Sequence, residues 1–103
     1  MKEKVASKLA NQFGKILSSQ GGNKFTDSIL SLVSKQFGSE LKEKYGSDDF
    51  DEILSGNSID ENDIKRYVSR LSGDNLKNAV NLYNKEYGGK TNIYSQGEKF
   101  ERL

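Results

Sequence analysis

The chain has 103 residues, a formal net charge of +1 and neither Cys nor His, which excludes Cys or His zinc sites, disulfides, thiol nucleophiles and imidazole catalysis. About a quarter of the residues are Val, Ile, Leu or Phe, a share above the level at which disorder is the default. We therefore expect one all-α domain over residues 1–89, a small bundle of four to five short helices, and a flexible C-terminal tail over residues 90–103.

Residues 2–19 form the first predicted helix. At 100° per residue its apolar side chains, Leu9 and Phe13 among them, fall in one arc, while lysines occupy the opposite face. This pattern predicts a bundle helix with a solvated lysine face, ended by Gly21 and Gly22. A helix lying on a membrane surface is the alternative, and the absence of Trp from the apolar face argues against it.

Residues 25–45 form the longest predicted helix, with Thr26 as its expected N-cap. Its apolar residues recur every four positions: Ile29, Val33, Phe37, Leu41 and Tyr45. Because the first helix has a row of the same spacing, we expect these two helices to pack against each other at an oblique angle. Both contain the tripeptide Gln-Phe-Gly, and we expect Gly14 and Gly38 to permit a close approach or a bend.

A short acidic helix is predicted over residues 48–54, with Ser47 as its N-cap and aspartates in the first turn, where the helix dipole favours negative charge. The sequence lacks the alternating oxygen ligands, the Gly and the distal Glu of a calcium loop, so no metal site is predicted. Phe50, Ile53 and Leu54 are expected to close one side of the core.

Two further helices are predicted over residues 59–71 and 75–87. Ser58 and Glu61 form the expected capping box of the first, and Asp74 is the expected N-cap of the second. We expect them to form an antiparallel hairpin against the first two helices. The residues expected to face the core are Ile64, Tyr67, Val68, Leu71, Leu76, Ala79, Val80, Tyr83 and Tyr87, and Leu82 is expected to lie on the opposite side of its helix.

The same stretch, residues 60–87, also has the outline of a helix-turn-helix motif. In that interpretation Arg66 and Arg70 contact the nucleic-acid backbone, and the outer face of the second helix reads bases or holds phosphates through Lys77, Asn78, Asn81 and Lys85. The nearly neutral local charge argues against strong binding, because nucleic-acid binders usually have a basic excess.

The tail over residues 90–103 has no clear periodicity but contains large apolar residues. Spaced apolar residues in a flexible segment are typical of a docking segment that orders against a partner or a neighbouring subunit. The residues predicted to bind a partner are Leu82, Ile93, Tyr94, Phe100 and Leu103. A tail that packs back on its own domain, or one that is simply frayed, is the alternative.

The sequence as a whole therefore predicts a non-catalytic protein-protein interaction module that binds a protein partner or a second copy of itself. No cofactor, metal or small-molecule substrate is expected. No signal peptide or membrane-spanning run is recognised, so we expect a cytoplasmic protein or one assembled into a particle, such as a phage or virus component. The alternative function is a small DNA- or RNA-binding regulator that uses residues 60–87.

Overall fold

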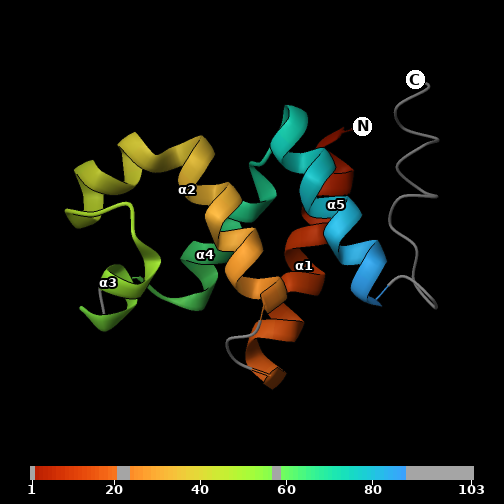
Figure 1. Cartoon of the computed structure of the whole chain (residues 1–103), viewed down its shortest axis with the longest axis horizontal. Helices are drawn as coiled ribbons and strands as arrows, with labels where there is room; N and C mark the ends of the chain where they lie inside the picture. Colours follow the sequence, from red (N-terminus) through yellow and green to blue (C-terminus); the bar gives the residue numbers. More distant parts are fainter. Residues whose placement is uncertain (1, 21–23, 57–58, 88–103) are drawn as a thin grey trace.

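The computed structural model describes residues 2–20, 24–56 and 59–87, and these residues form helices and no strand. The helices are α1 (Lys2–Gln20), α2 (Lys24–Tyr45), α3 (Phe50–Ser55), α4 (Glu61–Ser69) and α5 (Gly73–Tyr87) (Figure 1). This arrangement confirms the predicted small all-α bundle. The predicted tail, with Ile93, Tyr94, Phe100 and Leu103, lies outside the described residues.

The helices pair differently from the prediction. Helix α4 lies along α1, and α5 lies along α2, whereas α1 and α2 touch only slightly (Figure 1). The expected hairpin of α4 and α5 was wrong, because these two described helices each pack on a different partner. Periodicity identifies the face that a helix buries. Several helices of this chain have apolar rows of similar spacing that could pack on that face, so the actual partner depends on the loops that connect the helices.

Fully buried apolar side chains from four helices form one core. It includes Leu9 and Phe13 of α1, Ile29, Val33 and Leu41 of α2, and Val68 of α4, and α5 adds Ala79. Aromatic rings join three of the helices, since the Phe25 ring centroid lies 6.2 Å from that of Phe13 and 6.1 Å from that of Tyr83. The apolar face of each long helix was therefore predicted correctly, although its neighbour was not.

Helix α2 is kinked at Phe37, whose backbone angles of φ −118° and ψ 18° are not helical. Gly38 follows directly, so the predicted bend is confirmed at this glycine. Beyond the kink, Leu41 is fully buried, and the last turns of α2 lead toward α3 (Figure 1). Gly46 then ends the helix with a left-handed φ of 81°.

The N-caps of α3 and α4 lie two residues later than predicted. Asp49, not Ser47, caps α3, because its side chain accepts a hydrogen bond of 2.9 Å from the backbone nitrogen of Asp51. In α4 the capping box is formed by Asp60 and Asp63 in place of Ser58 and Glu61. Burial of the Ile59 side chain places Asp60 at the start of α4, whereas Ser58 lies outside the described residues.

Three further local predictions were wrong. Helix α2 begins at Lys24, so Thr26 lies inside its first turn and is buried, and α5 begins at Gly73, so Asp74 is also a first-turn residue. Leu54 is 41% exposed, whereas Phe50 and Ile53 of the same helix are buried. A six-residue helix presents less than two turns to the core, too few to bury all three apolar side chains.

Gly14 of α1 faces α4, and the Lys65 side chain of α4 leaves little room for a side chain at this position. A Cβ atom built on Gly14 would lie 2.7 Å from Cδ of Lys65. We expect Gly14→Ala to change the free energy of unfolding by less than about 1 kcal/mol, because the better helix propensity of Ala offsets displacement of a flexible lysine side chain. Urea denaturation measures this, with Lys65→Ala as the second arm of a double-mutant cycle. A loss above about 2 kcal/mol would show that the Lys65 side chain cannot move aside.

Candidate functional site

A groove lies on the surface between α2 and α5, with a volume of about 470 Å³. We call it the α2–α5 groove, and its lining residues are Ser28, Ser31, Leu32, Asn78, Asn81, Leu82 and Lys85. The residues from α2 stand at positions i, i+3 and i+4, and those from α5 at i, i+3, i+4 and i+7, so each set forms one stripe on its helix. The groove therefore follows from the pairing of α5 with α2.

Leu32 and Leu82 form the apolar part of the groove. Both are half-buried and pack against the edge of the core. The prediction that Leu82 lies on the free side of α5 is corrected, because α2 covers part of that side. Each helix thus contributes one leucine that is neither fully buried nor fully exposed, and a ligand that covered both would remove apolar surface from water.

The rim of the groove is polar and almost uncharged. Asn78 and Asn81 are exposed on α5, and Ser28 and Ser31 face them from α2. Lys85 is the single charged group of the lining and makes no ion pair with a described residue. Such a rim offers hydrogen-bond donors and acceptors around an apolar floor.

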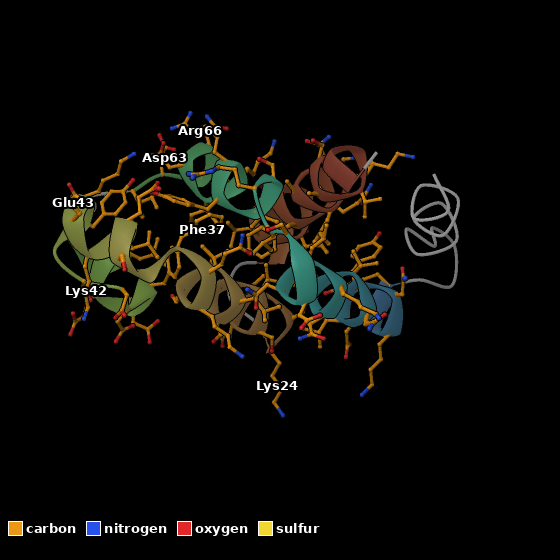
Figure 2. All side chains as sticks on the ribbon, turned by 90° about the horizontal axis from the view of Figure 1, so that it is seen from above. Lys24, Phe37, Lys42, Glu43, Asp63 and Arg66 are labelled. Atoms are coloured by element: carbon orange, nitrogen blue, oxygen red, sulfur yellow. The ribbon has the colours of Figure 1, made fainter. Side chains whose placement is uncertain are left out.

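The residues predicted to contact nucleic acid are spread over three places. Asn78, Asn81 and Lys85 line the α2–α5 groove, and Lys77 is exposed on α5 outside that lining. Arg66 lies at the opposite edge of the molecule beside Asp63, with which it forms an ion pair (Figure 2). Arg70 is held by Glu40 of α2. The described structure does not gather these side chains on one face.

A second hollow, the α1–α4 hollow, is more basic. Lys65 and Arg66 line it together with Ser7, Asn11 and Asn62. Arg66 is already paired with Asp63, and the Lys65 stem lies over Gly14, so both side chains already make contacts within their own domain. The α1–α4 hollow is thus a weaker candidate for an anion-binding site than its lysine and arginine content alone indicates.

A third hollow, the α2–α3 hollow, is acidic. Its lining includes Asp27, Asp48, Asp49 and Asp51. The Ser34 hydroxyl donates a 2.7 Å hydrogen bond to the backbone carbonyl of Asp48, which fixes the loop before α3. Among the described residues, no group of three His, Cys, Asp or Glu side chains is placed to hold a metal ion. Asp49 is moreover engaged in capping α3.

Arg70 belongs to a cluster at the kink of α2, which the sequence did not reveal. Its guanidinium donates hydrogen bonds of 3.1 and 3.3 Å to the carboxylate of Glu40, and its Cζ atom lies 4.7 Å from the ring centroid of Phe37. The Arg70 hydrogen bond lowers the pKa of Glu40. Figure 2 shows Phe37 inside the molecule, between α2 and α4. Arg70 therefore joins α4 to α2, which corrects the prediction that it points away.

Gln36 makes a second connection beside the same kink. Its Oε1 atom accepts a 3.1 Å hydrogen bond from the backbone nitrogen of Ser72, and its Nε2 atom donates a 2.9 Å bond to the Ser72 hydroxyl. The turn between α4 and α5 is thereby tied to α2. No periodic signal marks a polar residue with this role, so sequence reasoning could not find it.

Tyr67 lies under Arg70, and its buried hydroxyl lies near the Glu40 carboxylate without forming a hydrogen bond of ordinary geometry. Burial, and then the nearby Glu40 carboxylate, raise the pKa of Tyr67 to about 12. The folded state thus holds this proton more tightly than the unfolded state, whose pKa is about 10. The resulting stabilisation is complete below pH 10 and is lost as the pH rises through 12.

We expect the free energy of unfolding of the wild type to fall more steeply between pH 10 and pH 12 than that of Tyr67→Phe. At pH 7 the variant should be within about 1 kcal/mol of the wild type in stability, because the lost hydroxyl is buried without a hydrogen bond of ordinary geometry. Urea titrations at several pH values measure both effects, and lysine titration cancels in the difference. If the free energies of unfolding of the two proteins changed with pH in parallel, the raised pKa of Tyr67 in the folded state would be contradicted.

No helix in the described part of the chain is long and apolar enough to cross a membrane. Comparisons of the chain with models of protein families, with curated proteins and with solved structures find no significant match.

Proposed function

We propose that this protein is a non-catalytic protein-binding module and that its partner binds in the α2–α5 groove. The observation that supports this most is the pair of half-buried leucines, Leu32 and Leu82, which face the groove from opposite walls. Peptide-binding grooves combine an apolar floor with a few polar groups that fix orientation. Neither leucine is needed in full by the core, so both can contribute to binding.

The dimensions and charge of the groove define the kind of partner. The stretch of α5 from Asn78 to Lys85 is about 10 Å long at 1.5 Å per residue, which matches two turns of a helix or a few residues of an extended peptide. We therefore expect a segment that presents one or two large apolar side chains to the leucines. Amide or hydroxyl groups in the segment pair with Asn78 and Asn81, and an acidic residue suits Lys85.

The groove chemistry favours binding over catalysis. Its lining provides hydroxyls, amides and one amine, with no carboxylate that could act as a general base beside a serine. The chain also has no His or Cys that could enter the groove from elsewhere. These features support a role in binding and not in catalysis.

A selection from a random peptide library on the immobilised full-length chain tests this proposal. Selected peptides should bind Leu82→Asn about 4- to 12-fold more weakly than wild type, because covering the exposed half of a leucine contributes about 0.8–1.5 kcal/mol. Leu54→Asn is the matched control, since Leu54 is an exposed leucine on α3, outside the groove lining. Equal binding to the two variants, with both folded by circular dichroism, would contradict the proposal, as would a selection that enriches no peptide.

Nucleic-acid binding is the second candidate, and the exposed polar side chains Lys77, Asn78, Asn81 and Lys85 of α5 favour it. Duplex and single-stranded DNA titrated between 50 and 200 mM salt separate the two candidates. Protein binding predicts no saturable complex with either probe at any salt concentration. A saturable complex whose affinity falls steeply with salt and is lost in Lys77→Ala/Lys85→Ala would support the nucleic-acid function instead.

A further inference from the structure

We infer that the segment that occupies the α2–α5 groove in the free protein is the C-terminal segment of the same chain, residues 90–103. This inference builds on the proposed function, since it names the occupant of the same groove. The segment has the composition that the groove requires, because Ile93 and Tyr94 are large and apolar and are flanked by Asn92 and Ser95. Its docking would cover Leu32 and Leu82 until a competing partner displaces it.

The place where the chain leaves α5 supports this occupant. Lys85 lines the end of the groove, and the helix ends two residues later at Tyr87. Gly88 and Gly89 come next in the sequence, and glycine is the residue that most readily permits a chain reversal after a helix. The described part of α5 therefore ends beside the groove, so a segment that reverses after Tyr87 can run back along α5.

The reach of the segment is sufficient. Leu82 lies five residues before Tyr87, or about 7.5 Å along the helix axis. Four extended residues after Gly89 span at most about 14 Å, so Ile93 and Tyr94 can lie over Leu82 even after part of that length is spent on the reversal. Fourteen residues, 90–103, exceed what is needed to run the whole length of the groove.

The short connection also favours docking within one molecule. A short flexible linker gives a tethered segment an effective concentration in the millimolar range, far above the concentration of a second copy in ordinary solution. A modest intrinsic affinity is therefore enough for the segment to occupy its own groove. A partner must then compete with it, so the C-terminal segment lowers the apparent affinity of the groove for a partner.

The absence of Cys from the chain permits a direct test with the full-length protein. The double variant Ser31→Cys/Ser95→Cys places one thiol in the groove lining and one beside Tyr94. In the control Ser55→Cys/Ser95→Cys, the first thiol is on α3, outside the groove lining. Both are oxidised at low micromolar concentration and followed by non-reducing electrophoresis and mass spectrometry.

We expect the groove pair to form an intramolecular disulfide at least about tenfold faster than the control pair, and the added change Leu82→Asn to remove that advantage. Equal rates in the two pairs would overturn the inference, because the segment would then have no preference for the groove. A disulfide-linked dimer as the main product, faster at higher protein concentration, would also overturn it by showing that the segment occupies the groove of a second copy.

The failures of the two proposals can be told apart. Library peptides that depend on Leu82, together with equal disulfide rates, would leave the protein-binding function standing and refute only the C-terminal occupant. Conversely, fast intramolecular oxidation without any selected peptide would uphold the occupant and refute the function. If both proposals hold, Ile93→Asn should raise the affinity of the full chain for a selected peptide, since the competing segment is weakened.

Discussion

Phe13→Ala is expected to lower the free energy of unfolding by about 3–5 kcal/mol, one of the largest losses that a single truncation produces. Phe13 is fully buried in α1, and its ring lies 6.2 Å from that of Phe25 in α2. Removing the ring leaves a cavity where α1 meets the rest of the core. Because a domain of this size has only about 5–15 kcal/mol of stability in total, the variant should lose a large share of it and unfold at a much lower urea concentration.

Urea denaturation followed by circular dichroism measures the loss in Phe13→Ala. Phe13→Leu is the matched control and should lose less, because most of the apolar volume remains. Leu54→Ala should change stability by less than about 0.5 kcal/mol, since that leucine is already exposed. A loss below about 1 kcal/mol in Phe13→Ala would contradict the central position of this ring.

Leu41→Ala is expected to cost about 2–5 kcal/mol, although the residue lies beyond the kink in α2. Leu41 is fully buried, because the change of direction at Phe37 keeps the end of α2 on the core and near α3. The loss should appear in one cooperative transition with the rest of the domain. This outcome would show that the kink does not divide the molecule into two separately stable parts.

A different result is expected for Leu41→Ala if the end of α2 is independent of the domain. If the end of α2 projected from the domain as an independent helix, the variant would lose helicity locally while the main transition stayed unchanged. Hydrogen exchange distinguishes the two cases, because a cooperative loss lowers the protection of α1 amides together with those near Leu41.

The sequence predicted which faces the helices bury but not which helices pair. The four-residue row of α2 was correct at Ile29, Val33 and Leu41, and the stripe of α4 was correct at Ile64 and Val68. Periodicity reports the direction of burial and contains no information about the neighbour. The packing of α4 on α1 depends on the loops between the helices and on the complementary volumes of their side chains, which cannot be read from the sequence of one helix alone.

The groove could be predicted only in part. Leu82 was identified as an apolar residue off the main face of its helix, but Leu32 was not, because a groove exists only where two helix flanks meet. Arg70 and Gln36 were missed for a different reason. Their partners, Glu40 and Ser72, lie 30 and 36 residues away along the chain, and no local pattern marks such polar contacts.

The most direct test of the groove as the binding face is a nuclear magnetic resonance titration of the methyl-labelled full-length chain with a selected peptide. If the peptide binds in the groove, the methyl signals of Leu32 and Leu82 should shift together and saturate together, while those of Leu54 stay in place. Shifts confined to Leu54 or to Ala10 of the α1–α4 hollow, with Leu32 and Leu82 unchanged, would contradict binding in the groove.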